Sequence, residues 1–230
     1  MQKMAEPEKV RRFLREEMHR YLIWRARQVV DEPPLIQATS QAYLNYSKGT
    51  VVMYALQDYI GEETVNLALR RLAEKYGFQG APYPTTRDLV RELRAVTPDS
   101  LQFVITDLFE TITLYENKAL EANAAKLPNG KFEVELKVGS RKFRADGKGN
   151  ETEIDILDYI DIGLFDENGE VLYLGKHRID RNQMTFKIVV GNKPSEAGID
   201  PYVKLIDKKR ENNRTAVSSL HDDSQTLSQR

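Results

Sequence analysis

The sequence predicts an α + β multidomain protein, with an all-α helical part followed by an antiparallel, immunoglobulin-like β-sandwich. Apolar residues recur at three- and four-residue steps up to about residue 112, which is the period of amphipathic helices. From about residue 113 the apolar residues alternate with polar ones, as in Phe132 to Val138, which is the period of strands. Two Asn-Gly pairs, Asn129-Gly130 and Asn168-Gly169, predict hairpin turns between such strands.

These observations divide the 230 residues into three parts. Residues 1–112 are predicted to be the helical part and residues 113–207 the β-sandwich. Residues 208–230 are rich in Asp, Asn, Ser, Gln and Arg and offer almost nothing to bury, so a disordered polar tail is expected. The length allows a buried core in each of the first two parts.

The first predicted helix runs from Pro7 to Val30, with apolar residues on one side and Arg and Glu between them. The segment Asp31-Glu32-Pro33-Pro34 ends it, because proline cannot continue the backbone hydrogen-bond ladder. The next segment, Leu35 to Asn45, is expected to be extended. A second helix is predicted from about Ser47 to Ile60, with Gly61 at its end.

Three further features complete the helical part. A third helix contains Glu62-Glu63 in its first turn, where carboxylates complement the helix dipole, and Gly77 is expected to end it. The segment Thr85-Thr86-Arg87-Asp88 has the spacing of a capping box and predicts the start of a helix. A last helix is expected to begin at Pro98-Asp99 and to continue through Ile112.

The strands are predicted from apolar residues of one parity. Three sets carry the prediction: Val134, Leu136 and Val138; Ile154, Ile156, Ile160, Ile162 and Leu164; Met184, Phe186, Ile188 and Val190. For both Asn-Gly pairs we expect a type I′ turn, in which both central residues have positive φ.

Composition excludes several classes of function. The net charge is −1, so neither nucleic-acid binding nor electrostatic docking to a membrane is expected. No apolar run approaches the length of a membrane span, so this chain is not expected to insert into a membrane itself. The chain contains no cysteine, which excludes disulfides and thiol chemistry.

The stretch from Leu44 to Tyr54 indicates function most strongly. Tyr46 and the pair Lys48-Gly49 lead directly into an apolar run of helical spacing, which places the Tyr46 hydroxyl at the start of a helix rather than inside a core. A tyrosine hydroxyl keeps its proton at neutral pH and can therefore donate a hydrogen bond to a developing negative charge. Tyr43 is expected either to line a cleft or to pack, and Trp24 to lie in a core or an interface.

A zinc site within this chain is not expected. Metallopeptidases bind zinc with H-E-x-x-H on a helix, where two His one turn apart share a face and the intervening Glu acts as base. The three histidines are His19, His177 and His221; none is followed by Glu, and no two lie within four residues of each other. With no cysteine to replace them, the sequence predicts no metal ligand set.

The segment Tyr46-Ser47-Lys48-Gly49 resembles the Tyr-x-Lys-Gly motif of the aminopeptidase N-type (gluzincin) zinc metallopeptidases. The resemblance covers residues 8 to 210, about nine-tenths of the chain. It includes the following stretches: Val52 to Gly61, Val65-Asn66, Ala68 to Arg71, Pro82 to Thr85, Ile105 to Glu110, Gly198 to Tyr202 and Lys204 to Asp207. These stretches look like the subgroup in which a peptidase part follows an ABC-type permease segment in one polypeptide.

The resemblance implies a function for the parent enzyme. There, zinc-bound water attacks the first peptide carbonyl, and Tyr46 stabilises the oxyanion; Lys48 and Gly49 would have structural roles, the glycine in close packing and the lysine toward solvent or a carbonyl. Zinc would belong to an upstream domain of the parent, and the substrate would be a peptide. The parent is implied to be membrane-anchored, with its peptidase part outside the cytoplasm.

The sequence departs from the family in two places. Both the zinc helix and the Gly-x-Met-Glu-Asn loop that binds the substrate amine are absent. The chain alone is therefore predicted to be a C-terminal, catalytically silent part without a cofactor of its own.

Two alternatives belong to other classes. In the first, the chain is a non-catalytic interaction or scaffold module of a membrane transporter, and Tyr46 only packs. An exposed Tyr46 in a concave wall favours the peptidase interpretation, and a buried Tyr46 favours the scaffold. In the second, the sandwich binds carbohydrate or calcium through Asp155, Asp158 and Asp161, although solvent-facing strand and turn positions are the preferred explanation of these aspartates.

Overall fold

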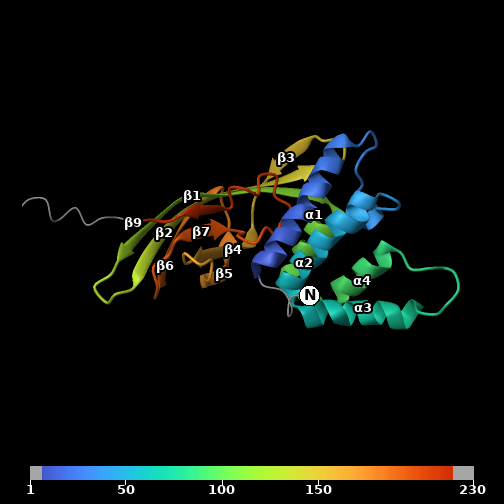
Figure 1. Ribbon diagram of the computed structural model, residues 1–230. Helices are drawn as coiled ribbons and strands as arrows, with labels where there is room; N and C mark the ends of the chain where they lie inside the picture. Colours follow the sequence, from blue (N-terminus) through green and yellow to red (C-terminus); the bar gives the residue numbers. More distant parts are fainter. Residues whose placement is uncertain (1–6, 220–230) are drawn as a thin grey trace, which may run out of the picture. The chain divides into compact units, whose positions relative to one another are not determined.

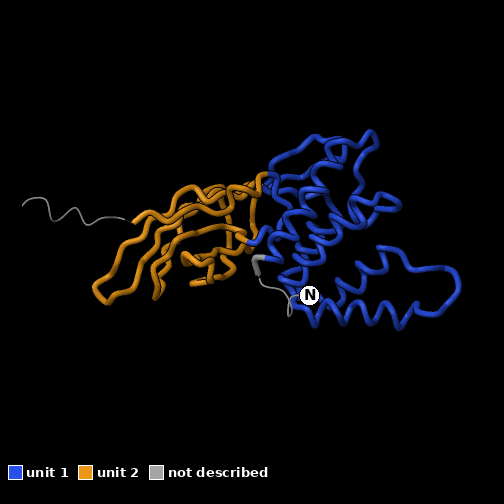
Figure 2. The backbone as a smooth tube through the Cα atoms, viewed as in Figure 1, with its two compact units in different colours: residues 1–115, 142–154, 202–208 blue, residues 116–141, 155–201, 209–230 orange. Residues whose placement is uncertain are grey.

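The computed structural model describes residues 7–219, which belong to two compact units (Figure 2). Unit 1 comprises residues 1–115, 142–154 and 202–208, and unit 2 comprises residues 116–141, 155–201 and 209–230. The fold class is mixed α + β, with helices and two sheets in which antiparallel pairs predominate. Each unit is assembled from three segments that are separate in the sequence. The units therefore do not correspond one to one with the predicted helical part, β-sandwich and tail, and the boundaries predicted at residues 112 and 207 stay predictions.

Unit 1 contains all the helices of the described residues (Figure 1). The α-helices are α1 (Pro7–Arg27), α2 (Gly49–Ile60), α3 (Glu62–Tyr76), α4 (Thr86–Val96) and α5 (Gln102–Ile105). Between them lie the 3-10 turns η2 (Leu35–Gln37) and η4 (Asp99–Leu101), and the π-helices η3 (Tyr43–Lys48) and η5 (Thr106–Glu110). The first four predicted helices are therefore present, with ends that differ by a few residues. The prediction of a single last helix from Pro98-Asp99 through Ile112 was wrong: η4, α5 and η5 follow one another up to Glu110, and Ile112 begins the strand β1 (Ile112–Lys126).

The core of unit 1 is formed by apolar side chains that the helical spacing places inward. The most deeply buried of them, with no more than 1% of their surface exposed, include Leu14, Met18, Tyr21, Leu44, Val52, Ala55, Leu56, Leu93, Ile105 and Phe109. The separate segments are attached to the helices by ion pairs. Lys204 Nζ lies 2.6 Å from Asp58 of α2, and the buried Lys142 lies 2.6 Å from Asp107 of η5.

The expectation of an extended segment from Leu35 to Asn45 was wrong. Its first residues form the 3-10 turn η2, and its last residues begin the π-helix η3. The Asn45 side chain donates to the Thr39 carbonyl at 2.8 Å, and the backbone N–H of Asn45 donates to the Gln41 carbonyl at 3.0 Å. These bonds close a helical turn before Ser47, and burial of Tyr43 and Leu44 stabilises it.

The predicted helix ends agree with the structure at two points. Gly61 ends α2 with φ +86°, a conformation that glycine adopts without strain. The capping box is present at the start of α4, where the Asp88 side chain accepts hydrogen bonds from the Thr85 backbone at 2.8 Å and hydroxyl at 3.0 Å. Glu62 and Glu63 lie in the first turn of α3, as predicted.

The strands are β1 (Ile112–Lys126), β2 (Phe132–Ala145), β3 (Glu151–Ile154), β4 (Asp158–Phe165), β5 (Val171–Ile179), β6 (Gln183–Val190), β7 (Glu196–Ile199), β8 (Arg214–Ala216) and β9 (Ser218–Ser219). One sheet has the order β3-β2-β1-β9, with β6 also paired to β2, and the other has the order β5-β4-β7-β8. The antiparallel β2–β6 pair joins Val134 to Ile188 and Leu136 to Phe186, within unit 2. The alternating residues Val134, Leu136 and Val138 are buried, as the pattern predicted.

The type I′ prediction for the hairpin turns was wrong. Gly130 and Gly169 have positive φ, but neither preceding Asn does. Instead, the Gly130 N–H donates to the Leu127 carbonyl at 2.9 Å, and the Leu127 N–H donates to the Lys131 carbonyl at 2.8 Å. This is a tight turn closed by a glycine bulge. In this turn Pro128 is the second residue, where its fixed φ near −65° suits a type I turn.

The predicted disordered tail contains structure in its first half. Residues 208–219 include β8 and β9. Strand β8 pairs with β7, so that Ala216 lies opposite Glu196 and Arg214 lies opposite Gly198. Asn213 is fully buried, and its side chain donates to the Asp200 carbonyl at 3.3 Å. Composition did not reveal this strand because its stability comes from pairing with β7 rather than from apolar residues of its own. The rest of the predicted tail lies outside the described residues.

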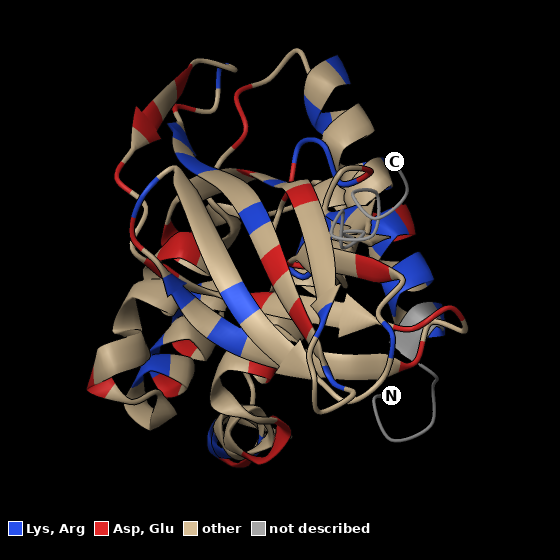
Figure 3. Ribbon diagram, turned by 90° about the vertical axis from the view of Figure 1, so that its left-hand side faces the viewer, with Lys and Arg blue, Asp and Glu red and all other residues tan. Residues whose placement is uncertain are grey.

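Among the described residues, no helix is long and apolar enough to cross a membrane. Basic and acidic residues are interspersed along the helices and strands (Figure 3), for example at the cross-strand pair of Glu135 with Lys187, 3.2 Å apart.

Candidate functional site

Tyr46 lies in η3, the π-helix that precedes α2. Its side chain is 74% exposed, and within residues 7–219 its hydroxyl makes no hydrogen bond. The Gly49 N–H donates to the Leu44 carbonyl five residues earlier, which is the bonding pattern of a π-helix. Such widened turns change the direction of side chains and occur frequently at functional sites. The hydroxyl of Tyr46 is therefore a free donor at the surface of unit 1.

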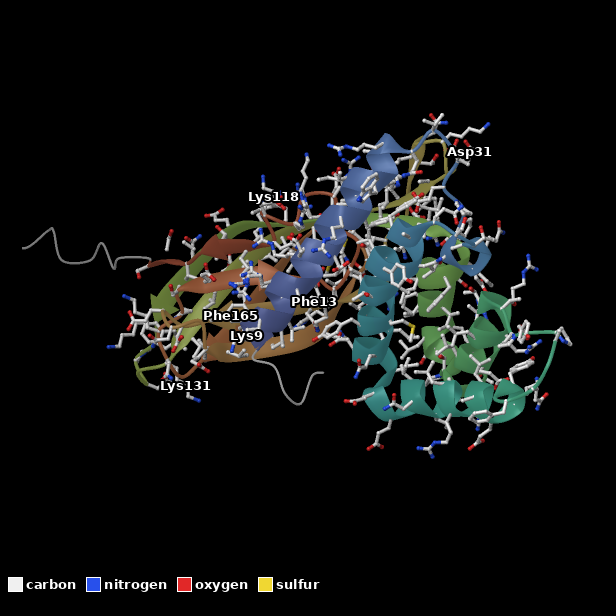
Figure 4. All side chains as sticks on the ribbon, turned by 45° about the vertical axis from the view of Figure 1, so that its right-hand side comes forward. Lys9, Phe13, Asp31, Lys118, Lys131 and Phe165 are labelled. Carbon is white, nitrogen blue, oxygen red and sulfur yellow. The ribbon has the colours of Figure 1, made fainter. Side chains whose placement is uncertain are left out.

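A pocket of about 410 Å³ adjoins Tyr46, entirely within unit 1. Residues of α1 and the loop after it line the pocket together with residues of η3 and the segment before it. The lining residues are Arg20, Trp24, Gln28, Gln41, Ala42, Tyr43, Tyr46 and Ser47. Because Tyr46 is one of these lining residues, it lies in a concave part of the surface. Figure 4 shows α1 and the loop after it, with Phe13 labelled on the helix and Asp31 in the loop.

A buried cluster of charged and hydroxyl groups lies beneath the pocket. Glu32 occupies its centre, with 3% of its side chain exposed. One carboxylate oxygen, Oε1, accepts from the Tyr21 hydroxyl at 2.6 Å and from Lys48 Nζ at 2.9 Å. The other, Oε2, accepts from Arg25 Nε at 2.6 Å. The cluster therefore joins α1, the loop after it and η3.

This arrangement corrects the role expected for Lys48. The lysine points neither to solvent nor to a backbone carbonyl; its side chain is 1% exposed and forms an ion pair with Glu32. Its ammonium also lies 5.2 Å from the centre of the Tyr21 ring, within the range of a cation–π interaction. Burial lowers the pKa of Lys48, and the Glu32 carboxylate opposes this effect. The Lys48–Glu32 pair fixes the end of η3 to the loop after α1.

Tyr21 and Tyr43 connect the cluster to the pocket. Their rings stack with centroids 6.2 Å apart and an angle of 13° between their planes. Tyr43 is 8% exposed and lines the pocket, so it both packs and forms part of the concave wall. Burial raises the pKa of Tyr21 well above 10, and the Glu32 charge adds to this effect. Burial and the Glu32 charge raise the pKa of Tyr43 from 10.0 to about 12.

The raised pKa of Tyr43 predicts a loss of stability in alkali. Because the folded pKa lies above the unfolded value of 10.0, the contribution of Tyr43 is complete below pH 10 and is lost as the pH rises toward 12. We expect the free energy of unfolding to fall over this interval in urea titrations. In Tyr43→Phe, which cannot ionise there, the fall should be smaller. An equal fall in both proteins would contradict the prediction.

Gly147 holds the Glu32 backbone in position. Its carbonyl accepts from the Glu32 N–H at 2.9 Å, its φ is +86°, and a Cβ here would lie 2.5 Å from the Glu32 carbonyl oxygen. A methyl group at residue 147 therefore cannot be added without displacing Glu32. Gly149 has a similar φ of +96° but has no atom within 4 Å of the corresponding position.

We expect Gly147→Ala to destabilise the protein more than Gly149→Ala. Both substitutions impose the cost of a left-handed conformation, about 1–2 kcal/mol. Only the first also creates a steric overlap, which adds roughly 1–3 kcal/mol. Chemical unfolding of the two variants measures the difference directly. Equal destabilisation would show that the approach of Gly147 to Glu32 does not constrain the fold.

The residues considered for metal binding are not brought together. Among residues 7–219, no group of three or more His, Cys, Asp and Glu side chains could hold a metal ion. Asp155 is exposed, whereas Asp158 and Asp161 are buried, which corrects their assignment to solvent-facing positions. Asp161 lies 3.2 Å from Lys176, a pairing that favours a structural role. His221 lies outside the described residues.

The buried cluster was not predicted from the sequence. Glu32 was interpreted only as part of the segment that ends the first helix, and Trp24 as a core or interface residue; Trp24 is 51% exposed in the pocket wall. One signal was present: Lys48 shares the helix face of Leu44 and Val52, both buried, and a lysine on such a face requires a buried counter-charge. The identity of that counter-charge, Glu32, depends on tertiary structure.

Comparisons with known proteins add no family assignment. No protein-family model matches this chain, and a search among curated proteins found no match either.

Proposed function

We propose that this chain is the tyrosine-bearing, C-terminal part of a zinc aminopeptidase-like protein, with Tyr46 as the donor to the oxyanion formed during peptide hydrolysis. The observation that carries the proposal is the position of Tyr46, which is 74% exposed and lines a pocket. A residue kept only for packing would be buried. The resemblance of the segment from Tyr46 to Gly49 to the Tyr-x-Lys-Gly motif supplies the reaction class.

The described residues do not fit a zinc ion. They contain no group of three or more side chains of the kinds that bind zinc. Under this proposal, zinc and its ligands come from an upstream domain of the parent polypeptide. By the same resemblance, the parent is anchored in a membrane through a permease segment, with its peptidase part outside the cytoplasm.

Tyr46 has the chemical properties that the proposed role requires. Attack on a peptide carbonyl places negative charge on its oxygen, and a fixed hydroxyl donor stabilises that charge more than the neutral carbonyl. Within residues 7–219 the Tyr46 hydroxyl has no competing acceptor. Lys48 follows Tyr46 by two residues, and its ion pair with Glu32 anchors η3. This anchoring would limit the movement of the Tyr46 hydroxyl.

The β-strands permit a finer proposal for the second part of the chain. We propose that they form an immunoglobulin-like sandwich. Two sheets, the antiparallel pairs of β4 with β5 and β7, and the tight hairpins support this assignment. The parallel pairing of β1 with β9 is an addition to that pattern.

The proposal is tested by comparing two proteins. One is the complete gene product that contains these residues, and the other is the 230-residue chain alone. We expect the gene product to hydrolyse aminoacyl-arylamides and to lose this activity with a chelator, whereas the chain alone should be inactive. Chelator-sensitive activity in the chain alone would contradict the proposed dependence on an upstream zinc domain. An inactive gene product would contradict the peptidase function and favour a scaffold module of a transporter.

A further inference from the structure

We infer that the pocket beside Tyr46 binds an uncharged apolar side chain of a peptide, with Trp24 and Tyr43 as the walls that contact it. This inference rests on the proposed function for the peptide nature of the ligand and adds the class of side chain. The pocket has a volume of about 410 Å³, within the range of sites for small ligands. Two of its aromatic residues come from different elements, Trp24 from α1 and Tyr43 from η3.

One wall of the pocket is preorganised. The Tyr43 ring stacks on Tyr21, whose hydroxyl donates to the buried Glu32 at 2.6 Å. Lys48 and Arg25 fix the same carboxylate from two further directions. Because these contacts already order Tyr43, little side-chain entropy remains to be lost when a ligand binds.

The other wall presents a large apolar surface to solvent. Trp24 is 51% exposed, and within the part of the chain that the structure describes it makes no hydrogen bond or ring contact. An aliphatic or aromatic side chain placed against the indole ring would remove apolar surface of both partners from water. Trp24 is therefore a candidate specificity-determining residue.

The charges around the pocket favour an uncharged ligand. Among the residues that the structure describes, Arg20 is the only charged one that lines it. The Arg20 guanidinium lies 2.9 Å from Glu17 and 3.3 Å from Glu16, so its charge is already compensated. The other polar lining groups, among them Gln28 and Gln41, are neutral amides that suit a peptide backbone better than an ion.

Trp24 is the only tryptophan of the chain, so its fluorescence reports on the pocket directly. The purified 230-residue chain is titrated with N-acetyl-leucinamide and N-acetyl-phenylalaninamide, and in parallel with N-acetylglycinamide and N-acetyl-lysinamide. We expect a saturable blue shift in the millimolar range with the first two compounds and none with the other two. No shift with the apolar amides, or equal shifts with all four, would overturn the inference.

Two leucine substitutions provide the structural control. Ala42 lines the pocket and is exposed, so Ala42→Leu narrows the pocket without entering the core. Ala95 is exposed on α4 and does not line the pocket, so Ala95→Leu is the matched control. Ala42→Leu should weaken the response at least tenfold, and Ala95→Leu should leave it unchanged. Gln28→Arg provides a second variant, because it places a longer, charged side chain at an exposed lining position and should also weaken the response. A response that persists in both Ala42→Leu and Gln28→Arg would place the ligand elsewhere.

This test separates the inference from the proposed function, because fluorescence of the chain alone requires neither zinc nor turnover. If the chain shows a saturable shift but the complete gene product is inactive, the binding of an apolar side chain in the pocket is supported and the peptidase function is rejected. If the gene product has peptidase activity that depends on Tyr46 but the chain shows no shift, the peptidase function is supported and the binding inference is rejected.

Discussion

Glu32→Gln is expected to destabilise the protein by about 3–5 kcal/mol, the cost of removing one partner from a buried ion pair. Lys48 is 1% exposed and would lose its only carboxylate neighbour within residues 7–219. Glutamine keeps the size of the side chain and one acceptor oxygen, so the change isolates the charge. Lys48 would then have to remain charged without compensation or release its proton, and each outcome is costly. Urea unfolding followed by circular dichroism measures the loss.

Glu16→Gln is the matched control. Glu16 lies on α1 and pairs with Arg20 at 3.3 Å, with both side chains more than half exposed. Exposed pairs contribute at most about 1 kcal/mol, so this variant should unfold close to the wild type. If Glu32→Gln changed stability no more than Glu16→Gln, the buried cluster would not anchor η3.

The second large effect concerns catalysis. In the complete gene product, Tyr46→Phe is expected to lower kcat by about 10²–10³-fold, the loss typical for one oxyanion donor and equivalent to about 2.7–4 kcal/mol. The aromatic ring remains, so substrate binding and KM should change little. Stability should also be unaffected, because the hydroxyl is exposed and makes no hydrogen bond within residues 7–219.

Tyr83→Phe serves as the control for Tyr46→Phe. Tyr83 is 73% exposed, similar to Tyr46, but it lies in the loop between α3 and α4 and does not line the pocket. We expect its removal to leave kcat unchanged. A tenfold or smaller effect of Tyr46→Phe, or an equal effect of both substitutions, would remove Tyr46 from the catalytic assignment.

The helices could be predicted from the sequence because their determinants are local. Apolar spacing, Gly61 and the capping box from Thr85 to Asp88 each act within a few residues, and the structure contains all three. The alternating strands β2, β4 and β6 were predicted for the same reason. In contrast, β8 owes its place to pairing with β7, a contact between residues that are distant in sequence.

The candidate site could be predicted only in part. The motif led to the choice of Tyr46 and predicted it at the start of a helix; in the structure it lies within the π-helix η3, which begins at Tyr43 and precedes α2. Glu32 could not be identified, since its partners Tyr21 and Lys48 lie 11 and 16 residues away and come together only through tertiary packing. The exposure of Trp24 likewise depends on which face of α1 the other helices cover.

The coding sequence immediately upstream of Met1 tests the central claim most directly. If this chain is the tyrosine-bearing part of a zinc peptidase, the translated sequence should contain H-E-x-x-H on a predicted helix, with a further Glu on the next helix. An upstream sequence without these ligands would contradict the claim. Tyr46 would then lose its catalytic assignment, and the chain would be a non-catalytic binding module.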